Sequence, residues 1–591
     1  MKKLFFIFFV LIIISNNIYS QPLQPYGLPD AMNRTNILQQ DLNIFKSLTI
    51  NLDSFPVFPN FPKHIINSTF EGSIFCNMDN DPEMEIVINI GYTVQAFNLD
   101  GSNVTGWPKT VSSYVAEGAP AFGDIDGDGF GEIIVTNHGL TSGGYIYAYK
   151  RDGTTCTGFP INHGYSTRTP VLADVNNDGK MELIINKRTY PTGQVYIYKG
   201  DGTILTGWPK NLGHVPASSA AVGDIDGDNI PEIIAESYNS LYAWKPSGDS
   251  IPGFPFALPN GDVNSYSSPV LADINGDNYK EIIFGSHNSS TGGGSVYVLK
   301  KDGTVLTGWP KTVSNWIYSP PAVGYIDNDN YLDIAVGDQV MSASPTNYVY
   351  AWDRNGNQLT GFPIGPFNAI NCQISLADID GDNLTELIFD DNTYSTSTGL
   401  GQYLAYNHDG TPVTGWTLNT TGTTFFTTPC FTDMNRDGIL DIIGTGIEGT
   451  SPNQYTNVYL WNTGQVYHYS KIYNPIWQFN ERHNGVYGDI PPIVGVSSIN
   501  KNIPDKFELM QNYPNPFNPI TNIKYKIANN CFISLKVYDI LGKEVSSLVN
   551  EYKKAGIYEV KFDAKNLSSG IYFYKFTAGD FSETKMMTVI K

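Results

Sequence analysis

Short apolar runs alternate with polar loops along most of this chain, which is the pattern of short β-strands. In one representative stretch, the apolar run 119–123 leads into an acidic loop, and a second run follows at 132–136. A polar segment separates it from a third run at 145–149. Asp152-Gly153 then marks a hairpin turn, and we expect a fourth short strand to end in Gly158-Phe159-Pro160. Long amphipathic helices are not apparent, so the pattern predicts an all-β fold.

The same unit recurs, with a period that matches the blades of a β-propeller. Its acidic loops begin at residues 77, 124, 174, 224, 273, 325, 378 and 433, which are 47–55 residues apart. The hairpin turn and the aromatic-Pro pair recur with it, for example Asp201-Gly202 with Trp208-Pro209 and Asp302-Gly303 with Trp309-Pro310. Four strands per period of this length favour a propeller over the alternative, a β-solenoid.

The two ends of the repeat region predict how the ring closes. The stretch Phe58–Lys63 resembles the end of a unit without its first three strands, and Tyr455–Gly488, with Trp477-Gln478-Phe479, follows the last acidic loop. We expect these two ends to meet in one blade. The prediction is therefore an eight-bladed propeller, with seven blades as the alternative.

The acidic loops carry the candidate chemistry. In the second copy, Asp124, Asp126, Asp128 and Glu132 stand at positions 1, 3, 5 and 9 of a short loop. Alternate carboxylates on a tight loop point into one hollow and repel one another unless a cation lies between them. Oxygen ligands without Cys or His favour calcium. The spacing differs from that of an EF-hand, where the last acid stands at position 12 before a helix.

Eight such loops predict several structural calcium ions. The candidate ligands are Asn77, Asp79, Asp81, Glu85; Asp124, Asp126, Asp128, Glu132; Asp174, Asn176, Asp178, Glu182; Asp224, Asp226, Asp228, Glu232; Asp273, Asn275, Asp277, Glu281; Asp327, Asp329, Asp333; Asp378, Asp380, Asp382, Glu386; and Asp433, Asn435, Asp437, Asp441. The alternative is a set of acidic turns without metal.

The copies are unequal. Only the loops that open at Asp124, Asp224 and Asp378 have four carboxylates. Three others have an Asn at position 3, whose amide oxygen can still ligate at lower charge. The first copy has Asn77 at position 1 and Pro82 at position 6, and Tyr325 removes the first carboxylate of the sixth. We expect the first and sixth loops to bind most weakly. Position 6 is otherwise Gly or Asn, the residues that best tolerate a left-handed backbone.

Composition and the N-terminus indicate an exported protein. The chain has 591 residues and a net charge of −21, which argues against nucleic acid as a partner, and 27 of its 57 acids lie in the loops. Lys2 and Lys3 precede an apolar core, so residues 1–20 are predicted to be a signal peptide, followed by a leader at 21–47. No other segment could span a membrane. Five cysteines cannot all pair internally, and buried free thiols are expected, although Cys372 and Cys430 could pair.

The acidic loops and hairpins of residues 48–490 resemble the FG-GAP/VCBS repeat family, whose blades form calcium-binding propellers, as in the integrin head. The resemblance implies a ring with calcium in the loop between the first and second strands of each blade.

After a linker at 491–504, residues 505–591 predict a small Ig-like sandwich of about seven strands. Pro514–Pro519, Val537–Gly542 and Leu567–Tyr572 closely resemble the type A C-terminal sorting domain of the type IX secretion system. The resemblance implies that the secretion machinery is a partner. It also implies export through the periplasm to the outer cell surface or the medium.

Strand direction assigns a second face. Because the acidic loops join strands 1 and 2, the loops between strands 2 and 3 and the links between blades share the opposite face. That face is predicted to carry His138, Tyr165, Arg168, Lys187, Arg188, Tyr190, Tyr266, His287, Trp316 and Tyr318. Aromatics with a few polar groups suit a glycan or protein ligand. The function predicted is a calcium-stabilised binding or adhesion module without evident catalytic motif. The alternatives are a propeller-type polysaccharide lyase or other carbohydrate-active enzyme, in which His138, Arg168, Lys187 or His287 could act, and a purely architectural spacer.

Overall fold

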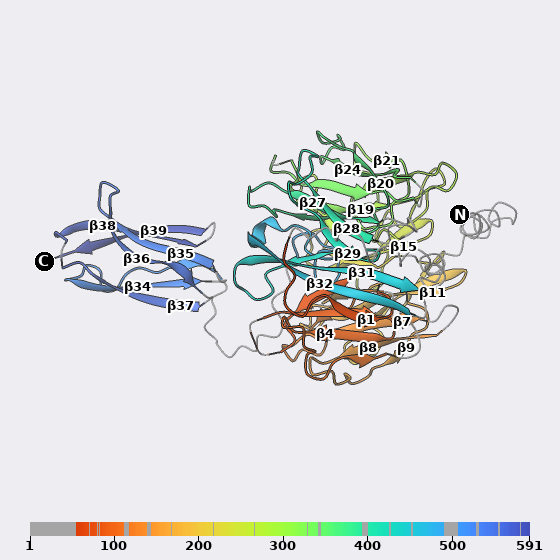
Figure 1. Cartoon of the computed structure of the whole chain (residues 1–591), viewed down its shortest axis with the longest axis horizontal. Coiled ribbons are helices and arrows are strands. Elements are labelled where there is room, and N and C mark those ends of the chain that lie inside the picture. The colour runs from red at the N-terminus through yellow and green to blue at the C-terminus, as the bar shows by residue number, and fades with distance from the viewer. Residues whose placement is uncertain are drawn as a thin grey trace, which may run out of the picture. The chain divides into compact units, whose positions relative to one another are not determined.

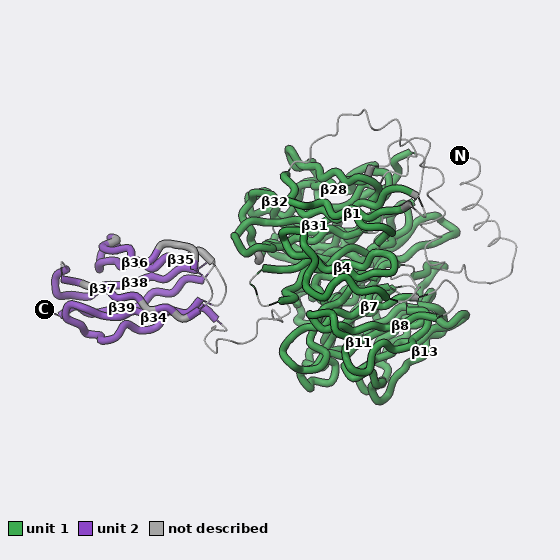
Figure 2. The backbone as a smooth tube through the Cα atoms, turned by 60° about the horizontal axis from the view of Figure 1, so that its bottom comes forward, with its two compact units in different colours: residues 1–496 green, residues 497–591 purple. Residues whose placement is uncertain are grey.

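The computed structural model describes residues 55–489 and 506–590, with gaps at 70, 80, 82, 112–117, 139–142, 167, 217, 265, 328, 341–343, 393–399, 425–426, 451–452, 528–530, 554–555, 566 and 579–580. The predicted signal peptide, leader and linker lie outside the described residues. The chain divides into two compact units, residues 1–496 and 497–591 (Figure 2). Each is described below by itself.

The first unit consists of eight four-stranded antiparallel sheets (Figure 1). In the order of pairing they are β2 (Ser73–Cys76), β3 (Glu85–Ile90), β4 (Thr93–Phe97), β5 (Lys109–Thr110); β6 (Ala121–Gly123), β7 (Glu132–His138), β8 (Gly144–Tyr149), β9 (Ile161–Asn162); β10 (Val171–Ala173), β11 (Glu182–Thr189), β12 (Thr192–Tyr198), β13 (Lys210–Leu212); and β14 (Ala221–Gly223), β15 (Glu232–Ser237), β16 (Ser240–Trp244), β17 (Phe256–Ala257).

The other four sheets follow the same order. They are β18 (Val270–Ala272), β19 (Glu281–Gly285), β20 (Gly294–Leu299), β21 (Lys311–Val313); β22 (Ala322–Gly324), β23 (Asp333–Gly337), β24 (Asn347–Trp352), β25 (Ile364–Phe367); β26 (Ser375–Ala377), β27 (Glu386–Asn392), β28 (Leu400–Tyr406), β29 (Leu418–Thr421); and β30 (Cys430–Thr432), β31 (Ile439–Thr450), β32 (Asn453–Val466), β1 (Lys63–Ile66).

The eighth blade joins the two ends of the repeat region and confirms an eight-bladed propeller. Its outer strand β1 comes from the start of the chain and pairs antiparallel with β32, from Lys63 opposite Val458 to Ile66 opposite Tyr455. On the inner side, β30 of this blade contacts β2 of the first. The ring is therefore closed by backbone hydrogen bonds within one sheet, as predicted from the incomplete unit near Phe58.

The fourth strand of each blade differs from the prediction. In the second blade, β9 begins after Gly158-Phe159-Pro160, whereas the sequence pattern placed this motif at its end. The motif forms a turn instead, with Gly158 at φ 89°. Its aromatic ring reaches the next blade: the indole N–H of Trp107 donates to the carbonyl of Arg151, and that of Trp208 to the carbonyl of Pro246, both at 2.8 Å. The motif therefore joins neighbouring blades.

The core lies between the blades, and both faces of the inner strands contribute to it. All six residues of β3 and all five of β19 are buried. Runs such as Glu85-Ile-Val-Ile-Asn-Ile are buried without alternation because each blade packs against a neighbour on either side. Cys76, Cys156, Cys372 and Cys430 are buried free thiols, as expected, so Cys372 and Cys430 do not pair.

A segment after β32 lines the inner edges of the blades, which corrects the placement of Trp477-Gln478-Phe479 in the closing blade. It contains a 3-10 turn, Tyr469–Lys471, and continues to Asp489. Its carbonyl oxygens accept hydrogen bonds from backbone N–H groups of the inner strands of four successive blades. Glu481 accepts from Phe122 (2.8 Å), Arg482 from Leu172 (2.9 Å), Asn484 from Val222 (2.8 Å) and Gly485 from Leu271 (2.7 Å).

This central segment is itself buried. Trp477 is 1% exposed, and Gln478 and His483 are 0% exposed. The Gln478 side chain donates to the carbonyl of Ala220, and its backbone N–H donates to the Gln373 side chain. The inner strands present unpaired N–H groups where they approach the axis, and such groups are costly when buried without a partner. The segment after β32 supplies those partners, which explains why it runs through the ring.

The second unit is a sandwich of seven strands in two sheets, as predicted. One sheet has the order β33 (Glu508–Leu509), β34 (Ile520–Ile527), β37 (Gly556–Asp563), and the other β36 (Glu544–Lys553), β35 (Cys531–Tyr538), β38 (Gly570–Ala578), β39 (Phe581–Val589). Tyr525, Tyr574 and Phe576 fill the space between the sheets and are at most 2% exposed. Among the described residues of the chain, no helix is long and apolar enough for a membrane span.

The central segment generates a prediction about stability. Replacement Trp477→Ala removes a 1% exposed indole from the axis, and we expect it to lower the free energy of unfolding by about 3–5 kcal/mol. The exposed Tyr190, at 44%, is the control, and Tyr190→Ala should change stability by less than about 0.5 kcal/mol. Denaturant unfolding of both variants, followed by far-ultraviolet circular dichroism so that the signal does not depend on tryptophan, measures the two free energies. Equal stability of the two variants would contradict the assigned role of the segment.

Candidate metal sites in the acidic loops

Each acidic loop joins the first strand of a blade to the second, and its own carboxylates hold its turn by accepting backbone N–H groups of the loop. In the second blade, Asp124 accepts the backbone N–H groups of Gly127 and Gly129 at 2.7 and 2.8 Å. Asp126 accepts that of Asp128 at 3.1 Å, and Asp128 that of Phe130 at 2.9 Å. Position 6 is left-handed in seven loops, as predicted: Gly129, Gly179, Asn229, Asn278, Asn330, Asn383 and Gly438 have φ of 64–87°. Pro82, at this position in the first loop, lies outside the described residues.

The carboxylates converge in five loops. Their ligand oxygens lie within 4.8 Å of one another in the groups Asp79, Asp81, Glu85; Asp124, Asp126, Glu132; Asp224, Asp226, Glu232; Asp327, Asp329, Asp333; and Asp378, Asp380, Glu386. The first and sixth loops, which the sequence predicts to be weakest, belong to this set. Asn77 uses its amide N–H groups within the first loop, donating to the carbonyls of Asp81 and Glu83 at 2.8 and 3.1 Å. The ring of Tyr325, which stands at position 1 of the sixth loop, packs edge-on against that of Tyr473, with 5.4 Å between the ring centroids. These acidic clusters could hold metal ions.

The acid at position 9 is the most buried group of every loop. Its carboxylate accepts the backbone N–H of the second loop residue in all eight copies, for example Ile125 to Glu132 at 3.0 Å and Ile379 to Glu386 at 2.9 Å. Burial, together with the neighbouring carboxylates, raises the pKa of Glu132 and Glu386 to about 8. A cation among these groups would hold the buried acid ionised.

The three loops with Asn at position 3 differ from expectation in the orientation of the amide. The oxygen of Asn176 accepts the backbone N–H of Asp178 at 2.9 Å, while its nitrogen donates to Glu182 at 2.7 Å. Asn275 likewise donates to Glu281 at 2.6 Å, and Asn435 donates to Asp437 at 3.0 Å. The amide therefore presents a hydrogen-bond donor to the carboxylates. The sequence pattern indicated only the amide oxygen as a ligand.

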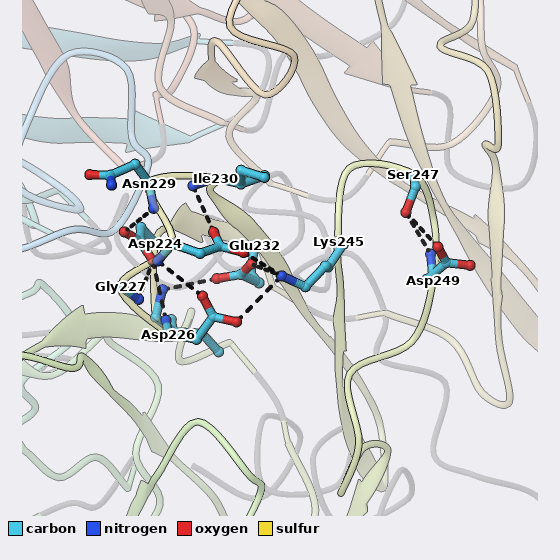
Figure 3. A network of polar contacts seen from close by, with 11 residues as sticks. Asp224, Asp226, Gly227, Asn229, Ile230, Glu232, Lys245, Ser247 and Asp249 are labelled. Carbon is cyan, nitrogen blue, oxygen red and sulfur yellow. Dashed lines mark hydrogen bonds and ion pairs between the residues drawn. The ribbon is translucent and has the colours of Figure 1, made fainter.

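Two lysines, which the sequence pattern had not singled out, contact the loops. Lys150 and Lys245 open the turn between the third and fourth strands of the second and fourth blades. The ammonium of Lys150 lies 2.7 Å from Asp126 and 2.9 Å from Asp128. That of Lys245 lies 2.6 Å from Asp228 and 3.4 Å from Asp226 (Figure 3). Both contacts show that the third turn of a blade is on the same face as its acidic loop. A lysine two residues before the Asp-Gly or Ser-Gly turn is the signal that could have identified them.

The links between blades lie beside the far ends of the second strands, which agrees with the predicted opposite face. Isolated β-bridges join Ser166 to Lys187, Val263 to His287 and Trp316 to Gln339. Arg188 stacks on Tyr165 with 4.8 Å to the ring centroid, and the ammonium of Lys187 lies 5.4 Å from the ring of Tyr196. His138 ends β7, and its side chain lies outside the description.

Aromatic rings form a continuous row on this face. Successive centroids are 4.9 Å apart for His214 and Tyr238, 6.5 Å for Tyr238 and His287, 4.4 Å for His287 and Trp316, 5.9 Å for Trp316 and Tyr318, and 5.2 Å for Tyr318 and Tyr266. All except His287 are half-buried, so they keep a solvent-accessible part. Burial lowers the pKa of His287 to about 4, so its ring is neutral at physiological pH.

The row ends on a buried ion pair. The guanidinium of Arg168 stacks on Tyr266 at 4.2 Å and lies 3.0 Å from Glu71. The side chains of Arg168 and Glu71 are 6% and 0% exposed. The hydroxyl of Thr169 also donates to Glu71. These contacts bury the guanidinium of Arg168 rather than leaving it extended into solvent.

The buried acids predict a pH dependence of stability in the absence of metal. The folded-state pKa of Glu85, Glu132, Glu386 and Asp441 is raised to about 8, so the folded protein binds protons that the unfolded chain releases at lower pH. The stabilisation that these four protonated groups give to the folded state is complete below their pKa in the unfolded chain. It is lost as the pH rises toward 8. Each group contributes a slope of up to about 1.4 kcal/mol per pH unit.

We therefore expect the melting temperature in chelator to fall between pH 5.5 and 8, and the increase produced by added cation to grow over the same range. Differential scanning calorimetry measures both, and Glu386→Gln should reduce the slope. A melting temperature that stays constant across this range would contradict the assignment.

Known families match two parts of the chain. Residues 124–185 match the family described as FG-GAP-like repeat, and residues 511–591 match the family described as Secretion system C-terminal sorting domain. A comparison with curated proteins gave no match.

Several solved structures are similar to this chain. The biofilm matrix protein Bap1 of V. cholerae is 15% identical, with 72% of this chain and 91% of that chain covered and a TM-score of 0.49. The C-terminal domain of Pseudomonas aeruginosa PilY1 is 12% identical, with 65% and 88% covered and a TM-score of 0.32. PorZ, a surface component of the type IX secretion system of Porphyromonas gingivalis, is 13% identical, with 87% and 80% covered and a TM-score of 0.21.

The eight-bladed ring rests on the strand pairing described above and not on these similarities. The two family matches agree with the resemblances seen in the sequence, one within the propeller and one across the C-terminal sandwich. The chain therefore contains an FG-GAP-like repeat within a β-propeller and ends in a type IX secretion C-terminal sorting domain, which directs it to the outer cell surface or the medium.

Proposed function

We propose that this chain is an exported binding protein whose propeller is stabilised by calcium and binds a glycan or a protein on the face opposite the acidic loops. The observation that carries the proposal is the row of rings from His214 to Tyr266, all half-buried except the buried His287. Flat, preordered rings bind sugar faces and apolar side chains with little loss of conformational entropy.

The donor set supports calcium as the cation. The candidate ligands are carboxylate and amide oxygens, and loops of this kind are flexible enough for the six to eight oxygens that calcium takes. The ligands lie between the first two strands of a blade, and calcium there would neutralise the repulsion among Asp378, Asp380 and Glu386. In this proposal the metal is structural, and the ligand binds elsewhere.

Charged groups that an enzyme could use have structural partners on the binding face. Arg168 pairs with Glu71, Lys187 lies over Tyr196, and His287 packs against Trp316. These contacts favour a binding surface over a lyase. A lyase remains the outcome that the experiment below can detect.

The test uses the full chain in millimolar calcium with a panel of polysaccharides. We record retention on each immobilised polysaccharide and the appearance of new chain ends. Retention without cleavage is the expected result. New chain ends would show instead that the protein is a carbohydrate-active enzyme, and would contradict the proposed binding module. Absence of retention on every polysaccharide would leave a protein ligand, to be tested by crosslinking at the cell surface of the producing organism.

Trp316→Ala tests the row itself. Removing a central ring should weaken retention by about tenfold, since an aromatic anchor contributes about 1–2 kcal/mol to binding. Tyr331→Ala is the matched control, because Tyr331 is a 46% exposed aromatic residue of the sixth acidic loop. Equal loss in both variants would contradict the placement of the ligand.

Calcium binding has its own measurement. The melting temperature of the chelated protein should rise on addition of calcium. Asp378→Asn combined with Glu386→Gln should lower the number of ions bound by one, measured by equilibrium dialysis. No change in melting temperature and no bound calcium would contradict the proposal.

A further inference from the structure

Three acidic loops have the same four carboxylates but different neighbours. The loops of Asp124–Glu132, Asp224–Glu232 and Asp378–Glu386 are alike at positions 1, 3, 5 and 9. The difference lies across from them, at the residue that opens the turn between the third and fourth strands. This residue is Lys150 in the second blade, Lys245 in the fourth and Asn407 in the seventh.

In the second and fourth blades the lysine is placed among the carboxylates. Lys150 hydrogen-bonds to Asp126 and Asp128 at 2.7 and 2.9 Å. Lys245 bonds to Asp228 at 2.6 Å and lies 3.7 Å from the buried Glu232, so it faces the acids at positions 3, 5 and 9 together (Figure 3). An ammonium group thus already occupies a position where the carboxylates favour a cation.

In the described part of the chain no lysine pairs with the carboxylates of the seventh loop, and the ammonium of Lys471 contacts only its backbone, at 3.4 Å from the carbonyl oxygen of Asn383. The side chain of Asn407 donates to Thr411 in its own turn at 2.9 Å. Glu386 is 0% exposed, and its Oε1 has no hydrogen-bond partner among the described residues. A buried, unpartnered carboxylate oxygen beside Asp378 and Asp380 is costly unless a ligand satisfies it. This oxygen is a second, independent indication that the loop holds a cation. Glu232 Oε1 of the fourth loop also has no hydrogen-bond partner among the described residues, but the ammonium of Lys245 lies 3.7 Å from it.

The third and fifth blades show what determines whether the lysine forms an ion pair with the acidic loop. They have Lys199 and Lys300 at the same position, but among the described residues neither makes an ion pair with its loop. In these loops the amides of Asn176 and Asn275 already donate to the buried Glu182 and Glu281. The lysine therefore enters the loop only where position 3 is an aspartate.

We propose that Lys150 and Lys245 compete with the metal ion in their own loops, so that the seventh loop loads before the second and the fourth. This inference rests on the proposed calcium binding and deepens it by ranking three sites with identical ligands. A cation that enters the second or fourth loop must displace the ammonium from two or three carboxylates. The lost ion pairs are partly exposed, and the expected penalty is about fivefold in affinity for each loop.

The test reads each loop separately with terbium, a calcium substitute whose luminescence is sensitised by a nearby indole. Position 7 of the three loops is Phe130, Ile230 and Leu384. Each is replaced in turn by tryptophan in the full chain, giving Phe130→Trp, Ile230→Trp and Leu384→Trp. Terbium is titrated into each protein, and the bound terbium is then displaced with calcium. The Leu384→Trp protein should reach half-saturation at about fivefold lower metal than the other two.

Lysine variants then test the cause. Lys150→Met in the Phe130→Trp protein and Lys245→Met in the Ile230→Trp protein should each lower the half-saturation point by about fivefold. Asn407→Lys in the Leu384→Trp protein should raise it. Lys199→Met in the Phe130→Trp protein is the matched control and should change nothing, because Lys199 stands at the same position of the neighbouring blade without an ion pair to its loop.

The outcomes separate this inference from the proposed function. Equal half-saturation in all three loops, or no response to Lys150→Met and Lys245→Met, would overturn the competition while calcium binding stands. A protein that binds neither terbium nor calcium in any of the three loops would overturn both. Circular dichroism of each variant at saturating calcium establishes that the tryptophan and methionine replacements leave the fold intact.

Discussion

Each blade of the propeller buries the carboxyl group at position 9 of the loop between its first two strands, and in five of these loops the described ligand oxygens of three acids converge. The buried acid accepts the backbone N–H of the second loop residue in all eight copies, so it is part of the loop's framework and cannot turn away. Like charges in a desolvated hollow require a proton, a donor or a cation. An amide donor approaches the acids in some loops and an ammonium group in others, and oxygens such as Glu386 Oε1 have no hydrogen-bond partner among the described residues.

The ring depends on pairing partners that are distant in sequence. The strand β1 closes the eighth blade against β32, and the segment from Tyr469 to Asp489 satisfies the N–H groups of the inner strands. The C-terminal part of the propeller therefore both closes the ring, where β32 pairs with β1, and fills its axis. Between blades, the indole of the aromatic-Pro turn bonds to the following blade. These contacts make the ring one cooperative unit rather than a row of independent repeats.

The two faces of the ring have different chemistry. On one, acidic loops and the turns between third and fourth strands concentrate charge. On the other, links between blades place His287, Trp316 and Tyr318 in contact, with Arg168 fixed by Glu71 at the end of the row. A ligand on the aromatic face would be bound opposite the acidic loops, whose carboxylate clusters could hold metal ions. The C-terminal sorting domain accounts for how such a protein leaves the cell.

The sequence by itself determined the all-β class, the eight repeats, the position of the acidic loops and the sorting domain, while it left seven blades open as an alternative to eight. Each is encoded locally, in spacing, turn residues and runs of apolar side chains. The left-handed residue at position 6 followed from the same local rules. The partners of a motif such as Gly-Phe-Pro are distant in sequence, so the local pattern did not reveal them. The motif forms a turn that contacts the next blade, and it does not end a strand.

Only the tertiary structure placed Trp477 and His483 at the axis, oriented the amide of Asn176 toward Glu182, and brought Lys150 and Lys245 onto loops about 20 residues away. Distances through space decide which donor reaches a buried carboxylate, and a one-dimensional pattern does not contain them.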